Sequence, residues 1–407
     1  MLPTHQLKNK RILVGITGGI AAYKSCELIR YLITQGAEVR VMMTRAAEKF
    51  ITPLTLETLS KNPVSLDIFP EKQFTGTHHV HLADWAEAAI IAPASYNFIG
   101  KLYAGIADDL VTTIAAAVHC PMVIAPAMNV HMWNHPVLQR NLQELEKLGY
   151  LICPPEEGFL AEGYSGMGRL AALEHLLQYL YKAIHPEPNN LKGKTVLVTA
   201  GRTEEPIDAV RFLSNRSSGK MGFALAWEAF ARGAKVTLIH GPVHLPGPID
   251  IETIRINTAS EMDEAVQKKI NQADIYISAA AIADYTAEEP LNHKMKKKAQ
   301  GTTLHLKGTV DILKKAGEKR GKNQILVGFA VETDQPEKYA KQKLAEKHLD
   351  LIVLNNPKEA GAGFDTDTNI VTLFHKNGSN EQVAQMPKLD VAYHIFQFLQ
   401  KQDHTAG

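Results

Sequence analysis

The chain has 407 residues, of which 45% are hydrophobic and 21% are charged, and its net charge is +1 with histidine neutral. This length allows two or more hydrophobic cores, and this composition is typical of a globular protein. A net charge near zero gives no general attraction to nucleic acid or to an anionic membrane, so we expect neither as a partner.

The cysteines and the apolar runs bear on location. No run near the start has the length of a signal peptide, and no run reaches the roughly 18 to 20 apolar residues of a membrane helix. Cys26, Cys120 and Cys153 are odd in number and form no CxxC pair. They predict neither a disulfide framework nor a cysteine-rich zinc site, and we therefore expect a reducing, cytoplasmic location.

The first 185 residues have the pattern of an open parallel α/β sheet. An apolar run at 10–16 ends at glycines, a helical pattern follows at 20–36, and a second strand is expected at 36–44. Further strands are expected at 88–95, 120–129 and 149–155. Each of these runs is continuously apolar, as strands are when helices cover both of their faces.

A linker is expected at 186–190, within "HPEPNNLKGK", because proline, asparagine and glycine disfavour regular structure there. The same architecture then restarts over 191–407. Strands are expected at 194–201, 233–241, 273–285, 325–333 and 348–356, a helix at 219–233, and a late hairpin at 369–378. The sequence thus predicts an α/β protein with two Rossmann-like domains, 1–185 and 191–407.

Three polar or glycine-rich segments follow expected strands of the first domain: "TGGIAAYK" (17–24), "APASYNFIGK" (92–101) and "PAMNVHMW" (126–133). Ligands of open parallel sheets bind at the carboxyl ends of the strands. The first segment leads into a helix N-terminus, which suits a phosphate. It lacks the full GxGxxG spacing, so a purely structural tight turn stays open.

Three histidines, His78, His79 and His81, lie in "GTHHVHLADW" (76–85). They offer no helical i, i+4 pair and no accompanying acid, so we expect no metal site here. A histidine can accept a proton near neutral pH because its ordinary pKa is about 6.5. A catalytic base and a plain loop both remain open at this point.

These motifs, in this order and with "TRAAEKFITPLT" (44–55) and "GIADDLVTT" (105–113), resemble the flavin-dependent cysteine decarboxylases. The resemblance covers residues 10–180 and is strongest to the decarboxylase half of the bifunctional enzymes of coenzyme A biosynthesis. It implies a flavodoxin-like fold, FMN as cofactor, His79 as catalytic base and Asn129 as a catalytic and substrate-binding residue. Implied cofactor contacts are Gly18, Gly19, Ile20, Ala21, Thr44, Ala94, Ser95 and Asn97.

The implied reaction oxidises the cysteinyl thiol of 4'-phosphopantothenoylcysteine to a thioaldehyde, which serves as the electron sink for loss of CO2. Reduction of the remaining enethiolate then forms 4'-phosphopantetheine, and the flavin supplies the electron transfers. An amide such as Asn129 can donate to the carboxylate without adding a charge that would oppose its loss. The alternative for Asn129 is an ordinary turn asparagine after a strand.

The segment "GFLAEGYSGMGRL" (158–170) departs from this family, which carries a proton-donating cysteine where Glu162 stands here. A carboxylic acid can donate a proton only if burial raises its pKa. Glu162 as the catalytic acid and a slow reductive step with release of an oxidised enethiol both stay open. A smaller departure is Tyr96 and Phe98, where the family usually has small residues beside the flavin.

The run 201–230 in the second domain contains a strand end, a long polar loop and "SSGKMG", which opens a helix. Ser217, Ser218 and Gly219 suit a nucleotide phosphate there, although the P-loop spacing is absent. With "AAAIADY" (279–285), "HKMKKK" (293–298) and "VGFAVET" (327–333), this run resembles the ligase half of the same bifunctional enzymes. That resemblance implies a parallel-sheet ligase domain.

The implied ligase reaction activates the carboxylate of 4'-phosphopantothenate with CTP and Mg²⁺ as an acyl-cytidylate, which the amine of L-cysteine attacks. Implied catalytic and substrate-binding residues are Arg211, Asn215 and Lys294. Implied nucleotide contacts are Ser217, Ser218, Gly219, Ala281, Asp284, Phe329, Lys343 and Lys347. Lys343 and Lys347 lie one helical turn apart, so both can face one phosphate chain.

Plainer alternatives accompany these assignments. The lysine loop can be a solvated charge run, Lys343 and Lys347 can be the wet face of a helix, and Asp284 can be a turn cap. The resemblance implies self-association, as a homododecamer. The rival functions are an active ligase joined to an impaired or oxidative decarboxylase, and a non-catalytic flavin-binding regulatory scaffold.

Overall fold

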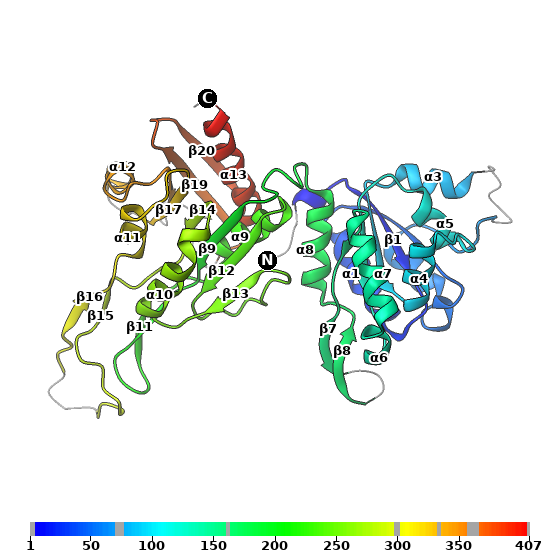
Figure 1. Cartoon of the computed structure of the whole chain (residues 1–407), viewed down its shortest axis with the longest axis horizontal. Helices are drawn as coiled ribbons and strands as arrows, with labels where there is room; N and C mark the ends of the chain where they lie inside the picture. Colours follow the sequence, from blue (N-terminus) through cyan, green and yellow to red (C-terminus); the bar gives the residue numbers. More distant parts are fainter. Residues whose placement is uncertain are drawn as a thin grey trace. The chain divides into compact units, whose positions relative to one another are not determined.

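The computed structural model describes residues 5–69, 77–159, 163–296, 302–331, 335–355 and 366–404. Its contacts divide the chain into two compact units, one ending at Pro188 and the other beginning at Asn189, and each is described by itself (Figure 1). Among the described residues, no helix is both long enough and apolar enough to cross a membrane.

The first unit is built on a six-stranded parallel sheet in the order β3-β2-β1-β4-β5-β6. Its strands are β1 (Arg11–Ile16), β2 (Glu38–Met43), β3 (Val64–Ser65), β4 (Ala88–Ala94), β5 (Met122–Pro126) and β6 (Leu151–Ile152). The five strands predicted from apolar runs are confirmed. Strand β4 is buried along its whole length, which explains its uninterrupted apolar sequence.

The helices of this unit are α1 (Ser25–Thr34), α2 (Pro53–Ser60), α3 (His78–Trp85), α4 (Tyr96–Ala104), α5 (Leu110–Ala117), α6 (Val130–Trp133), α7 (Pro136–Lys147) and α8 (Leu173–Ile184). Short 3₁₀ turns form at η1 (His5–Leu7), η2 (Ile20–Lys24) and η3 (Ala47–Lys49). The helix predicted at 20–36 therefore opens with the turn η2 and becomes α-helical only at Ser25. His79 lies within the first turn of α3.

Local signals explain where several helices begin. Asp109 caps α5 and forms a capping box with Thr112, and Thr52 caps α2, which has Pro53 at its first position. Beyond β6, the antiparallel hairpin β7 (Glu156–Phe159) and β8 (Ser165–Arg169) extends next to α6, as Figure 1 shows. No apolar run announces this hairpin in the sequence.

The second unit contains an eight-stranded sheet in the order β13-β12-β9-β14-β17-β18-β19-β20. Its strands are β9 (Thr195–Ala200), β12 (Lys235–His240), β13 (Glu252–Arg255), β14 (Ile275–Ser278), β17 (Ile325–Val331), β18 (Leu351–Asn355), β19 (Thr368–His375) and β20 (Asn380–Pro387). The first six strands are mutually parallel, as predicted. The late hairpin β19–β20 is confirmed. Its strand β19 pairs antiparallel with β18, so the sheet as a whole is mixed rather than parallel.

The helices of the second unit are α9 (Lys220–Ala231), α10 (Ala259–Lys269), α11 (Ile312–Glu318), α12 (Pro336–Glu346) and α13 (Lys388–His404), with the 3₁₀ turn η4 (Ile270–Gln272). Helix α9 is buried over ten consecutive residues, from Gly222 to Ala231, because it packs against β9, β12 and α13. Two short antiparallel ribbons, β10 (Glu204–Pro206) with β11 (Phe212–Ser214) and β15 (Tyr285–Ala287) with β16 (Leu306–Gly308), contact each other through β10 and β15.

Candidate active sites

A cleft of about 730 Å³ lies at the carboxyl ends of β1, β2 and β4 in the first unit, where ligands of parallel sheets bind. Four predicted cofactor residues line it: Gly18, Thr44, Ser95 and Asn97. The other four, Gly19, Ile20, Ala21 and Ala94, are not among the lining residues. Ile20 is exposed, and the side chain of Ala94 is buried within β4.

Thr17 joins the loops that form this cleft, and sequence reasoning missed it. Its buried hydroxyl donates to the carbonyl of Pro93 (2.7 Å) and accepts from the backbone N–H of Ser95 (2.8 Å). The Ser25 hydroxyl donates to the carbonyl of Ala92 (2.6 Å). These bonds connect the loops after β1 and β4, and thereby position Ser95 at the N-cap of α4.

The lining of the cleft fits a ligand held by neutral groups. The Thr44 hydroxyl is buried and has no hydrogen-bond partner in the part of the chain that the structure describes, which is costly unless a ligand supplies one. A Cβ on Gly18 would lie 2.5 Å from that of Ala46, so the loops after β1 and β2 meet closely only with glycine there. These residues fit a flavin with polar ring edges and a phosphate.

Both cationic side chains that line the cleft within the described residues already face carboxylates. Lys101 contacts Asp108 (2.8 Å) and Asp109 (3.4 Å), and its pKa is raised chiefly by the hydrogen bond to Asp108. Arg45 pairs with Asp67 and Glu48. We therefore expect backbone N–H groups and hydroxyls, rather than these cations, to hold an anionic group in the cleft.

The structure does not bring His79 and Asn129 into this cleft. His79 is half-buried in α3, next to His78, whose imidazole lies 3.1 Å from the Ser65 hydroxyl. Burial chiefly, and nearby Arg40 to a lesser extent, lower the pKa of His78. Asn129 caps α6 and lies beside the hairpin β7–β8. Glu162 lies outside the described residues.

Tyr96, where the family usually has a small residue, lines the cleft, and a contact with His135 sets the orientation of its ring. Its hydroxyl lies 3.2 Å from Nδ1 of His135, and the two rings meet edge to face. His135 in turn accepts from the N–H of Val137 at the start of α7. Phe98, the other departure, also lines the cleft, and its side chain is buried in the core of the unit.

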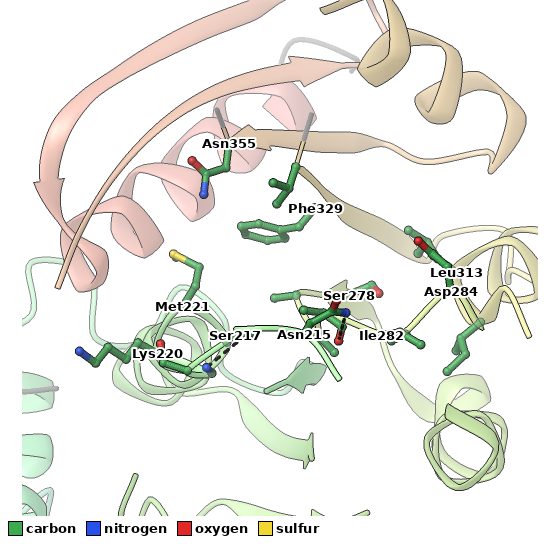
Figure 2. Close-up of a pocket in the computed structure, with 18 of the residues that line it drawn as sticks. Asn215, Ser217, Lys220, Met221, Ser278, Ile282, Asp284, Leu313, Phe329 and Asn355 are labelled. Carbon is green, nitrogen blue, oxygen red and sulfur yellow. Dashed lines mark hydrogen bonds between the residues drawn. The ribbon is translucent and has the colours of Figure 1, made fainter. Parts of the chain in front are cut away.

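The second unit contains a cleft of about 630 Å³ at the carboxyl ends of its parallel strands. All eight predicted nucleotide contacts line it, together with Asn215. They come from the loop before α9, the loop after β14, the strand β17 and the helix α12. In Figure 2 the Phe329 ring lies between Asn355 and the loop that carries Asn215 and Ser217.

The loop before α9 has the geometry of an anion site. Gly219 takes the left-handed conformation (φ 79°) at the N-cap of α9, and its N–H donates to the Ser217 hydroxyl (3.3 Å). A Cβ there would lie 2.6 Å from a methyl carbon of Val243. Because the first N–H groups of α9 have no partner within the helix, they can bind a phosphate at this end.

Asn215 joins this loop to the one after β14. Its amide donates to the carbonyl of Ala281 (3.0 Å), a contact drawn in Figure 2. Arg202 supports the same loop by donating to the carbonyl of Ser217 (3.2 Å). Hydrogen bonds within the chain thus hold the loop before α9 and the loop after β14 together at the polar wall of the cleft.

Lys343 and Lys347 both line the cleft, as their helical spacing predicted. The ammonium of Lys347 contacts both carboxylate oxygens of Asp311 (3.0 and 2.8 Å), and Asp311 also caps α11. Burial raises the pKa of Asp311, but the ion pair with Lys347 outweighs it and lowers that pKa. Sequence reasoning missed several lining residues, among them the charged or amide side chains of Asp311, Lys220, Asn355, Asn369 and Lys388.

Arg211 and Lys294 do not line this cleft. Arg211 follows β10 and contacts both the Asp208 carboxylate (2.8 Å) and the carbonyl of Met295 (2.5 Å). Lys294 is exposed beside Met295, whose N–H donates to Asp208 (3.1 Å). Asp208 thus contacts both Arg211 and Met295, the residue that follows Lys294.

No cluster of three histidine, cysteine or acidic side chains able to hold a metal occurs among the described residues. Asp284 and Asp311 both line the second cleft. Mg²⁺ commonly binds to one or two carboxylates and to substrate phosphates rather than to a complete protein cage. These two carboxylates fit such a role.

Comparison with known proteins accounts for both units. Residues 2–185 match the Flavoprotein family, and residues 191–402 match the DNA/pantothenate metabolism flavoprotein C-terminal domain. The coenzyme A biosynthesis bifunctional protein CoaBC of Bacillus subtilis (strain 168) is 49% identical over 393 residues, which is 96% of this chain and 97% of that protein. The chain belongs to the CoaBC family.

Another family member is similar over nearly the full chain, and a solved structure is similar to part of it. The CoaBC protein of Escherichia coli (strain K12) is 43% identical over 376 residues, 91% of this chain and 92% of that protein. The crystal structure of a CoaBC C-terminal domain is 38% identical, covers 53% of this chain and 99% of that one, and has a TM-score of 0.46.

Membership in the CoaBC family confirms the predicted resemblance and the predicted class, a bifunctional enzyme of coenzyme A biosynthesis with a flavoprotein first half. It also argues against a non-catalytic scaffold. The roles of single residues stay predictions, and the two clefts show only which of them lie together.

Proposed function

We propose that this chain joins 4'-phosphopantothenate to L-cysteine with CTP and then decarboxylates the product to 4'-phosphopantetheine. Residues 191–407 carry the ligase, residues 1–185 carry the FMN-dependent decarboxylase, and 186–190 link them. The observation that carries the proposal is the second cleft, which gathers nine predicted residues from four separate segments at one end of a parallel sheet. Family membership supplies the reaction class.

In the ligase, the N–H groups at the start of α9 and the lysines of α12 surround the phosphates of CTP. Lys347 then exchanges its contact with Asp311 for a phosphate oxygen. The freed Asp311 carboxylate and that of Asp284 would hold Mg²⁺, which would offset phosphate charge. Asn215 and Arg211 bind the phosphopantothenate and its acyl-cytidylate, and Lys294 acts on that intermediate. Attack by the cysteine amine forms the amide and releases CMP, after pyrophosphate has left.

In the decarboxylase, Gly18, Thr44, Ser95 and Asn97 would hold FMN, which supplies the two-electron oxidation and its reversal. His79 accepts the proton of the oxidation step, and Asn129 orients the carboxylate that leaves as CO2. Because His79 and Asn129 lie outside the flavin cleft of a single chain, a neighbouring copy completes the site. The family resemblance implies twelve copies, and we propose a homododecamer, located in the cytoplasm.

One reaction mixture tests the whole proposal. Purified protein, 4'-phosphopantothenate, L-cysteine, CTP and Mg²⁺ are combined, and masses are followed over time. Saturated 4'-phosphopantetheine is the expected product. A product lighter by two hydrogens would indicate decarboxylation without reduction, with Glu162 as the residue to test next. Accumulated 4'-phosphopantothenoylcysteine would leave only the ligase, and no change at all would overturn the proposal.

A further inference from the structure

Tyr164 lies immediately before β8 on the hairpin β7–β8, and its side chain is partly exposed. The amide nitrogen of Asn129 donates to the Tyr164 hydroxyl at 2.7 Å. The two residues are 35 positions apart in the chain. Their contact places a second polar group beside the predicted substrate-binding amide.

The hairpin is held against the Asn129 loop by backbone contacts that do not depend on Tyr164. The N–H of Met128 donates to the carbonyl of Gly168 (2.9 Å). A Cβ at Gly168 would lie 2.1 Å from the carbonyl oxygen of Met128, and its φ of 137° also favours glycine. Strand β8 contacts α6 as well, as Figure 1 shows. The Tyr164 hydroxyl is therefore brought to Asn129 by the fold.

The orientation of the Asn129 amide is set at both ends. Its oxygen accepts from the N–H of His131 (2.8 Å) as the N-cap of α6, so its nitrogen faces Tyr164. An amide nitrogen can only donate, so the Tyr164 oxygen is the acceptor in this pair. The proton of the Tyr164 hydroxyl is therefore not used in this contact.

We propose that Tyr164 is a substrate-binding residue whose hydroxyl, together with the Asn129 amide, holds the carboxylate that leaves as CO2. Both groups are neutral donors. They can orient an anion without the strong attraction of a lysine or arginine, which would stabilise the carboxylate in the ground state and so oppose its loss. This inference rests on the proposed decarboxylase function.

Tyr164→Phe removes only the hydroxyl and keeps the ring. Tyr103→Phe is the matched control, because Tyr103 lies in the same unit, is equally exposed and contacts Arg140 through its ring face. Dissociation constants are measured for 4'-phosphopantothenoylserine, which has a hydroxyl in place of the thiol, and for the ethanolamide that lacks its carboxylate. Bound flavin and ligase rate are recorded to show that both units remain folded.

We expect Tyr164→Phe to weaken binding of the serine compound about tenfold, since a hydrogen bond to a charged group is lost, and to leave the ethanolamide unchanged. Tyr103→Phe changes neither. Equal weakening of both compounds would assign Tyr164 a structural role in the hairpin and overturn the inference, and so would unchanged binding of both. If the unaltered protein binds neither compound, the proposed function itself fails.

Discussion

Gly219 begins α9 in a conformation and a space that other residues do not tolerate. Its φ of 79° lies in the left-handed region, and a Cβ would lie 2.6 Å from Val243 and 3.3 Å from Cα of Gly201. Gly193 offers a comparison, because its φ is 81° but no atom lies within 4 Å of the position of a Cβ. Comparing substitutions at Gly219 and Gly193 therefore separates the cost of backbone strain from the cost of steric crowding.

We expect Gly219→Ala to lower the free energy of unfolding by about 2–4 kcal/mol, since left-handed strain adds to overpacking, and Gly193→Ala by only about 1 kcal/mol. Urea unfolding of the two variants measures the difference. Gly219→Ala should also raise the KM for CTP, because the N–H groups of the α9 N-terminus move. Equal destabilisation by the two changes would show that the Val243 contact is easily relieved.

The side chain of Asp208 joins two elements of the second unit, the turn between β10 and β11 and the segment that carries Lys294. It accepts from the N–H groups of Val210 and Arg211 (2.8 Å each) and of Met295 (3.1 Å). Burial raises its pKa, but these hydrogen bonds and the Arg211 charge outweigh it and lower the pKa to about 2. The carboxylate is therefore charged throughout the neutral range.

We expect Asp208→Asn to loosen the segment 291–296, because the amide loses the ion pair and one acceptor oxygen. Hydrogen exchange of that segment, followed by mass spectrometry at neutral pH, should become faster, and the KM for 4'-phosphopantothenate should rise. Glu289→Gln is the control, because it removes the charge of an exposed carboxylate two residues before this segment. An unchanged rate of hydrogen exchange at 291–296 in Asp208→Asn would contradict the role of Asp208 in holding this segment.

The sign of the pH effect follows from the lowered pKa. The folded value of about 2 lies below the unfolded value near 3.9, so the contribution of Asp208 to stability is complete above about pH 4. It is lost as the pH falls through 2. The difference in free energy of unfolding between the unaltered protein and Asp208→Asn should therefore narrow between pH 4 and pH 2.

At the scale of the whole molecule, the proposed homododecamer would let a second copy bring His79 or Asn129 to the flavin cleft, which does not include them in one unit. We expect light scattering to give twelve times the mass of one chain. A monomer with bound flavin and full decarboxylase activity would contradict the shared site. The same measurement on Tyr164→Phe should give the unaltered mass, because the proposed role of that side chain is to bind substrate rather than another copy of the chain.

The elements that the sequence predicted are those whose signals are local. The run "AAIIAPA" of β4 is apolar because both of its faces are covered, and the capping residues Thr52 and Asp109 mark helix starts through contacts three positions away. The short hairpin β7–β8 and the two ribbons were missed. Their strands have no apolar run, and the pairing partner of Tyr285 is Gly308, 23 positions away.

The sequence by itself determined the two-domain α/β plan, the family and nine residues of the second cleft, because apolar periodicity and ordered motifs are written in consecutive positions. Only the tertiary structure decided which side chains meet. Asp311 with Lys347, Asp208 with Met295 and Asn129 with Tyr164 are separated by 36, 87 and 35 positions. Such pairs form because packed sheets and loops bring distant segments together, and no local pattern of residues records that approach.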